Sequence, residues 1–92
     1  MIVNLYAVFD SASGVYDGPI PGQADGSVIR AFSDKAVADD NPVGQHPECY
    51  TLFKVGTWND GTGEAIGVMP EKLINGVEAV AMGKEIVKDL EN

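Results

Sequence analysis

One histidine and one cysteine are the residues of this chain that most readily suggest chemistry. His46 and Cys49 lie three positions apart, in the segment His-Pro-Glu-Cys. A metal site needs several ligands that converge on one point, and the chain has no second histidine or cysteine to join this pair. We therefore interpret residues 46–49 as a surface turn and expect neither a metal nor another cofactor.

The sequence shows no pattern of residues that is typical of a catalytic site either. A nucleophilic hydroxyl or thiol needs a neighbouring base that a third group orients, and no spacing around His46 favours such a triad. Residues 59–64 lack the alternating ligands and the correctly placed glutamate of a calcium loop. Gly61-Thr62-Gly63 is too short to cradle a phosphate group. We expect a protein that is not an enzyme.

A lysine beside aromatic residues suggests binding rather than catalysis. Lys54 and Trp58 are expected on the same face of one strand, and Tyr6 could join them from a neighbouring strand. Such a surface can stack the bases of single-stranded DNA. Trp58 could equally lie in the core, so this surface is an alternative interpretation.

Charge argues against strong binding to nucleic acid. The chain has 14 acidic and six basic residues, for a net charge of −8. Residues 1–46 hold six acids and two bases, and residues 47–92 hold eight acids and four bases. No basic patch is therefore hidden in either half, and phosphate backbones are repelled. An acidic surface favours a basic protein partner, or serves only to keep the protein in solution.

Length and composition predict one cytoplasmic domain, residues 1–92. A single cysteine cannot form an internal disulfide, which fits a reducing compartment. The sequence shows neither a basic start with a cleavage site nor an apolar run long enough for a bilayer. We expect no association with membranes.

The first third of the chain predicts a hairpin. Residues 2–9 are apolar at both alternating sets of positions, which is typical of a central strand covered on both faces. Residues 10–14 form a turn, and residues 15–16 return as a short strand. Pro19 and Pro21 are expected to end the pairing, because proline has no amide hydrogen to donate.

A helix is predicted next, with Asp25 as its N-cap. Apolar residues follow at three- and four-residue spacing, which marks a buried face. These residues are Val28, Ile29, Phe32 and Ala36. The helix should end near residues 37–38, and residues 39–49 form a polar connection.

A second hairpin is predicted from residues 50–58 and 64–68, with the turn 59–63 between them. The first of these strands should place Phe53 and Val55 on one face and Leu52 and Trp58 on the other.

The last helix is predicted to begin at Pro70, with Glu71 near its positive end and Lys88 near its negative end. Gly76 and Gly83 would let another backbone approach closely. Two apolar stripes are expected on this helix: Leu73, Val77 and Val80, and then Met82, Ile86 and Leu90. The second stripe suggests a homodimer through this helix; alternatively, both stripes cover one core.

The order of elements, ββαββα, predicts an α+β fold: a small antiparallel sheet of two hairpins with two helices on one face. Residues 9–14 and 58–63 share the pattern aromatic, Asp/Asn, two variable residues, Ser/Thr, Gly. This echo reflects either a duplication or a turn chemistry that the two hairpins share.

Three segments carry a resemblance to a known family. They read Tyr6-Ala7-Val8-Phe9-Asp10, then Ile29-Arg30-Ala31-Phe32, and then His46-Pro47-Glu48-Cys49-Tyr50-Thr51-Leu52-Phe53-Lys54-Val55-Gly56. In this order and spacing, over residues 2–63, the chain resembles the small non-structural protein of gokushoviruses, which are single-stranded-DNA phages of the microvirus group. Cys49 stands where that pattern usually has aspartate.

The resemblance implies a protein that is absent from the virion and acts in the cytoplasm of the infected bacterium. It also implies a role in genome replication, at the switch from duplex replication to single-strand synthesis. No catalytic residue is carried over. His46, Pro47 and Tyr50 either contribute to function or fix the angle at which the chain enters the next strand.

Three hypotheses follow. The first is a regulator without enzymatic activity that binds a viral or host replication protein. The second is a weak single-stranded-DNA-binding protein that uses Lys54 and Trp58. The third, from charge alone, is an acidic antagonist of a host protein that mimics DNA. The candidate interaction residues are His46, Tyr50, Lys54 and Trp58.

Overall fold

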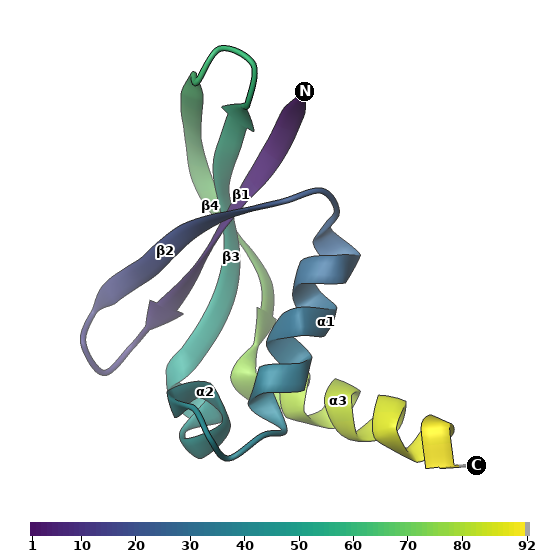
Figure 1. The fold of residues 1–92 in the computed structure, drawn as a ribbon. Coiled ribbons are helices and arrows are strands. Elements are labelled where there is room, and N and C mark those ends of the chain that lie inside the picture. Colours follow the sequence, from purple (N-terminus) through teal and green to yellow (C-terminus); the bar gives the residue numbers. More distant parts are fainter. Residues whose placement is uncertain (92) are drawn as a thin grey trace.

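Four antiparallel strands form one sheet in the order β2-β1-β3-β4 (Figure 1). Strand β1 spans Ile2–Asp10, β2 spans Val15–Gly22, β3 spans Tyr50–Asn59 and β4 spans Ala65–Asn75. The structure, a computed structural model, describes the backbone of residues 1–91 and the side chains of residues 1–85. The two central strands, β1 and β3, come from different hairpins, so their pairing joins the two halves of the chain.

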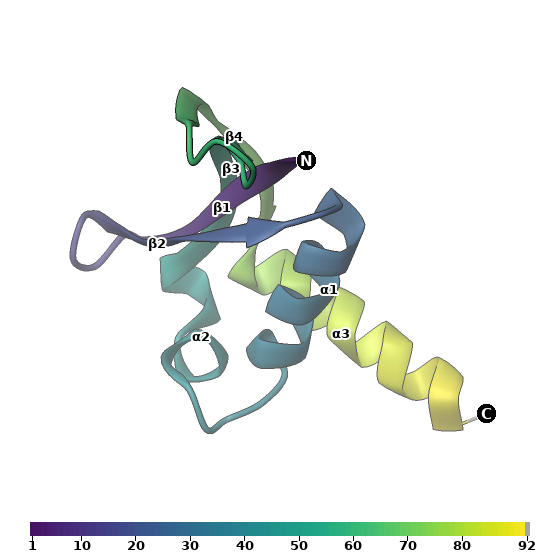
Figure 2. The same ribbon diagram turned by 45° about the horizontal axis from the view of Figure 1, so that its top comes forward.

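The helices lie on one side of this sheet (Figure 2). Helix α1 spans Asp25–Ala36 and α3 spans Gly76–Glu91, and the two pack against each other. The connection between α1 and β3 contains a short helix α2, Pro42–Gln45, and a 3₁₀ turn η1, Pro47–Cys49. The predicted α+β fold with the order ββαββα is confirmed, with these two short turns added between α1 and β3.

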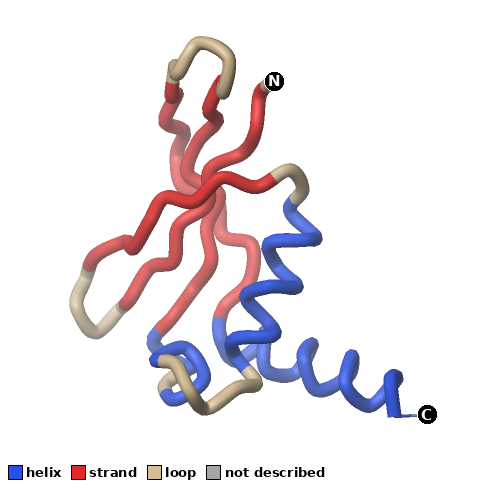
Figure 3. Tube along the Cα trace, in the orientation of Figure 1, coloured by secondary structure: helices blue, strands red, loops and turns tan. Residues whose placement is uncertain are grey.

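The two hairpins end in turns that Figure 3 draws in tan, and both turns use the same chemistry. In the first, the Asp10 carboxylate accepts a hydrogen bond from the Ala12 amide at 2.9 Å, and Gly14 has φ +76°. In the second, the Asn59 side chain accepts one from the Gly61 amide at 2.9 Å, and Gly63 has φ +80°. The sequence echo therefore corresponds to a shared turn in which a side-chain oxygen closes the loop and glycine takes the left-handed conformation.

Strand β2 is longer than predicted, because Pro19 and Pro21 lie inside it rather than after it. The register continues past both prolines, with Tyr6 opposite Ile20 and Leu5 opposite Pro21. Because β2 is an edge strand, it can contain residues that have no amide hydrogen to donate.

The last helix begins at Gly76, so the prediction that Pro70 starts it was wrong. Pro70 and Glu71 belong to β4, another edge strand. The helix start is fixed instead by Asn75: its side chain accepts a hydrogen bond from the Glu78 amide at 2.8 Å, and the Glu78 carboxylate accepts one from the Asn75 amide at 3.2 Å. This reciprocal pair is a capping box. The side chain of Lys88 lies outside the described residues.

The core lies between the sheet and the helices. Its buried members are Tyr6, Phe32, Ala36, Leu52, Ile74 and Ala79. Val28 and Ile29 of α1 pack against this cluster, so the predicted apolar face of that helix is confirmed.

No helix among the described residues covers the opposite side of the sheet (Figure 2). The strand register places apolar side chains on this side. Strand β1 was expected to be central and covered on both faces, and only the first half of that prediction is correct. We call this side the open face and define it by Val3, Leu5, Ala7 and Phe9 of β1, Tyr16 of β2, and Phe53 and Trp58 of β3.

Candidate interaction groove

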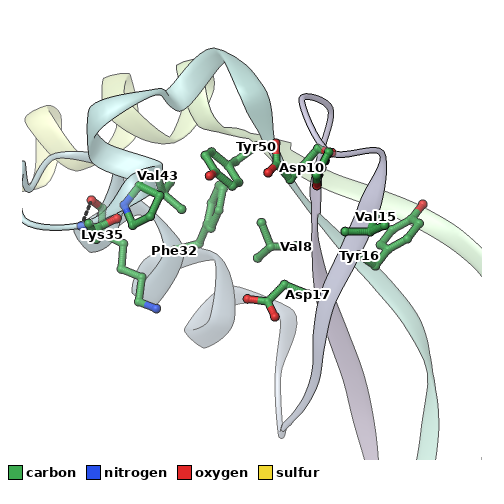
Figure 4. Close-up of a pocket in the computed structure, with 12 residues that line it drawn as sticks. Val8, Asp10, Val15, Tyr16, Asp17, Phe32, Lys35, Val43 and Tyr50 are labelled. Carbon is green, nitrogen blue, oxygen red and sulfur yellow. Dashed lines mark hydrogen bonds between the residues drawn. The ribbon is translucent and has the colours of Figure 1, made fainter.

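A groove of about 390 Å³ lies between the β1–β2 hairpin and the helices α1 and α2 (Figure 4). Its floor is apolar and its rim carries acidic groups. The floor consists of Val8, Phe32, Val43 and Tyr50, and the polar lining includes Asp10, Asp17, Lys35 and Asn41. Because the lining comes from segments far apart in the sequence, the groove exists only in the folded chain.

Strand pairing places the two aspartates on the rim. Asp17 lies opposite Val8, and Asp10 lies opposite Tyr50. Both aspartates therefore share the helix-bearing side of the sheet with the buried Tyr6. The register between β1 and β2 shifts between Tyr6 and Val8, and this irregularity determines the side on which Asp17 projects.

The opposite wall is held by contacts between α1 and α2. The Asn41 side chain donates a hydrogen bond to the Lys35 carbonyl at 3.0 Å and accepts one from the Gly44 amide at 3.1 Å. A side chain at Gly44 would collide with the Ala38 carbonyl, so α2 approaches the end of α1 as closely as glycine permits. This packing places Val43 against the core cluster, on the groove side.

Electrostatics in the groove are mainly negative. Burial raises the pKa of the Tyr50 hydroxyl, and the nearby charge of Asp10 raises it further, with smaller contributions from Cys49 and Asp17. Lys35 adds one positive charge to the lining. An apolar floor with an acidic rim suits an apolar side chain that is flanked by basic groups.

A smaller hollow of about 250 Å³ adjoins the groove and shares Asp10 and Tyr50 with it. His46 and Cys49 also line this hollow. The structure thus brings two of the four candidate residues, His46 and Tyr50, together around Asp10. The His46 Nδ1 atom lies 3.8 Å from a Glu48 carboxylate oxygen, and both side chains are well exposed. Among the residues that the structure describes, no three potential metal ligands cluster.

Lys54 is placed differently from the prediction. Its ammonium nitrogen lies 3.0 Å from an Asp25 carboxylate oxygen, and the other oxygen of Asp25 accepts a 2.6 Å hydrogen bond from the buried Tyr6 hydroxyl. Asp25 was expected to be the N-cap of α1. The N-cap is Ala24, and Asp25, in the first turn, binds the sheet instead. The hydrogen bond from Lys54 to Asp25 raises the pKa of Lys54.

Trp58 lies on the open face, opposite Val3, so Lys54 and Trp58 do not share a strand face. The register shift between Leu5 and Tyr6 makes Val55 an extra residue in β3, which turns Lys54 toward the helices and Trp58 away from them. The prediction that Leu52 and Trp58 share a face fails for the same reason. Trp58 lines a shallow hollow of about 290 Å³ with Val3 and Pro21.

Several groove residues were missed by the sequence analysis, among them Asp17, Lys35, Asn41 and Val43. The segment around Asp17 was assigned too short a strand, which hid its alternation with Val15. Asn41 and Gly44 had a detectable signal, because an Asn side chain before Pro42 is a good N-cap.

In the part of the chain that the structure describes, no helix has the length and apolar character needed to cross a membrane. Compared with known families, residues 3–79 match the family model described as "Phage ORF5 protein". This range contains the groove and the whole sheet except its first residue. No curated protein and no solved structure matches the chain.

Proposed function

The chain belongs to the Phage ORF5 protein family, and from this premise we propose that it is a non-structural phage protein without enzymatic activity that binds a protein of the viral or host replication machinery. The observation that carries the proposal is the groove, with its apolar floor beneath Asp10 and Asp17. Its chemistry fits a partner segment in which an apolar side chain is flanked by lysine or arginine.

The charge of the whole chain supports the same choice of partner. A net charge of −8 attracts basic protein surfaces and repels phosphate backbones. Lys54, the cation on which direct DNA binding was expected to depend, is engaged by Asp25. The resemblance to gokushovirus proteins adds the setting: the cytoplasm of the infected bacterium, at the switch from duplex replication to single-strand synthesis.

The first test measures how tightly the wild-type protein and the Asp17→Lys variant bind the purified replication proteins of the phage and of its host. Asp17 is exposed on the groove rim, so reversing its charge should leave the fold intact and weaken binding at least about tenfold. The matched control is Asp34→Lys, which makes the same charge change on an exposed position of α1 outside the groove lining. Equal losses in both variants would contradict a role for the groove.

The second test uses fluorescence anisotropy with labelled single-stranded and duplex DNA at low and moderate salt. We expect no binding to either DNA. Binding that prefers the single strand, weakens with salt and is reduced by Trp58→Ala would replace the proposal with direct single-strand binding, because Trp58 and the aromatic residues of the open face could then stack bases.

A further inference from the structure

The open face carries a contiguous aromatic cluster that contributes nothing to the main core. The Phe9 and Tyr16 rings lie 4.9 Å apart between centroids, and the Tyr16 and Phe53 rings lie 5.5 Å apart in an edge-to-face arrangement. Tyr16 remains 45% exposed. Apolar faces of this kind are uncommon on soluble monomers and usually mark a contact surface.

This face is also free of net charge, although the chain as a whole is strongly acidic. The aspartates that the sheet carries or contacts, Asp10, Asp17 and Asp25, lie on the helix-bearing side. The charges nearest to the open face are already paired. Lys72, opposite Phe53, lies 3.2 Å from Glu78, and the Met1 amine at the far end lies 2.8 Å from Asp60.

From this arrangement we propose that two copies of the chain associate by stacking their open faces. A basic protein would find only the Asp60 carboxylate there, which is already paired with the Met1 amine, and a nucleic acid would find no free cation. A second copy meets neither difficulty. Stacked sheets lie about 10 Å apart, so the acids on their outer sides are separated by more than the Debye length of about 8 Å at physiological salt.

The two ends of the open face complement each other. The cluster of Phe9, Tyr16 and Phe53 lies at one end, and the hollow beside Val3 and Trp58 lies at the other. A two-fold axis near the middle of β1 places each cluster over the hollow of the other copy, which is the self-complementarity that an isologous dimer needs.

The size of the face fits such a dimer. Strand β1 has nine residues, and four strands of that length cover on the order of 600 Å² in projection. Of the residues that define the face, Tyr16 is exposed, Ala7 is buried and the others are half-buried, so the face offers less than the about 800 Å² per partner of a standard interface and suits the small interface of a weak dimer.

The test is sedimentation equilibrium of the full chain and of two variants with comparably exposed residues. We expect a dimer at about 100 µM protomer, a concentration at which a dissociation constant of about 1 µM leaves roughly nine-tenths of the chains dimeric. Tyr16→Glu should raise the dimer dissociation constant at least about tenfold, because it buries a charge in the interface. Met82→Glu on α3, where the wild-type residue is 42% exposed compared with 45% for Tyr16, should leave it unchanged.

A second measurement needs no variant. Trp58 is the single tryptophan of the chain and lies on the open face, so its quenching by acrylamide should fall as the protein concentration rises.

Far-UV circular dichroism confirms that each variant is folded, and Asp17→Lys, in the groove on the other side of the sheet, should dimerise like the wild type. A monomer at about 100 µM, or a dimer that Met82→Glu disrupts and Tyr16→Glu does not, would overturn the proposal. If the protein is a monomer and a single-stranded oligonucleotide quenches Trp58 fluorescence, the open face binds DNA bases instead of a second copy.

Discussion

Asp25 joins the first helix to the middle of the sheet through one carboxyl group. One oxygen accepts a hydrogen bond from the hydroxyl of the buried Tyr6, and the other lies 3.0 Å from the Lys54 ammonium. The hydrogen bond from Tyr6 lowers the pKa of Asp25 most, and the contacts with Lys54 lower it further. Asp25 therefore favours the ionised state, which stabilises the junction between α1 and β3.

This junction predicts a pH dependence of stability. The pKa of Asp25 is lower in the folded protein than in the unfolded chain, so its contribution is complete above about pH 5 and is lost as the pH falls through the folded-state value. Asp25→Asn should cost about 1 kcal/mol at neutral pH, a modest figure because the side chain is 39% exposed and solvent screens the pair. Urea unfolding over a pH series should show the difference from wild type shrinking in acid.

The matched control is Asp34→Asn, another acidic position on α1, which is exposed and forms no ion pair within the described part of the chain. Its stability should track that of the wild type at every pH. A penalty for Asp25→Asn that persists unchanged at acid pH would contradict the assignment of the effect to the ionised carboxylate.

Among the elements, α3 depends on glycine for its place in the fold. A side chain at Gly76 would collide with the Pro47 backbone, and one at Gly83 would lie 2.9 Å from the Ser33 carbonyl oxygen of α1. The backbones that approach these glycines therefore belong to the same chain. The homodimer predicted through the C-terminal helix stays a prediction, with the side chains of Ile86 and Leu90 outside the described residues.

Substituting alanine at two helical glycines should give opposite results. Gly76→Ala is expected to destabilise the protein by about 2 kcal/mol, because the methyl group forces α3 away from η1. Gly26→Ala, in α1, meets nothing within 4 Å and should be neutral or stabilise the protein by up to about 1 kcal/mol, because alanine restricts the unfolded chain. Thermal unfolding of both variants checks this, and equal effects would contradict the packing of α3 against η1.

Elements with strong local signals were predictable from the sequence. The turns at Asp10 and Asn59 and the apolar spacing of α1 depend on neighbouring residues, and the structure confirms them. The start of α3 was misplaced because Pro70 suits both a helix start and an edge strand, and only the sheet order distinguishes the two. The spacing of Asn75 and Glu78, which is typical of a capping box, indicated the correct start of the helix.

At the scale of the whole molecule, the two surfaces of interest lie on opposite sides of one sheet and meet at Tyr16, which belongs to the open face and also lines the groove. The groove faces the helices and is acidic, whereas the open face is apolar and carries no net charge, since Lys72 beside it is paired with Glu78. Neither could be predicted from the sequence, because both depend on the pairing of β1 with β3 and on bulges that reverse the direction of single side chains. Tyr50 was identified as a candidate without the partners that surround it.

The charge of the molecule predicts how salt affects the proposed dimer. Two chains that each carry −8 repel one another. Raising the salt concentration from about 0.01 M to about 0.15 M shortens the Debye length from about 30 Å to about 8 Å, so the dimer dissociation constant should fall severalfold. The Asp34→Lys variant, which is less negative, should show a smaller dependence. A dimer that weakens as salt rises would contradict an apolar interface.

The prolines in the outer strands limit how far association can proceed. Pro19 and Pro21 interrupt the row of amide donors along β2, and Pro70 does the same along β4. A further chain therefore finds no continuous edge on which to extend the sheet. Stacking through the open face buries that face in both copies. The proposed assembly would therefore close at two chains, with neither an open edge nor an open face left on which fibres could grow.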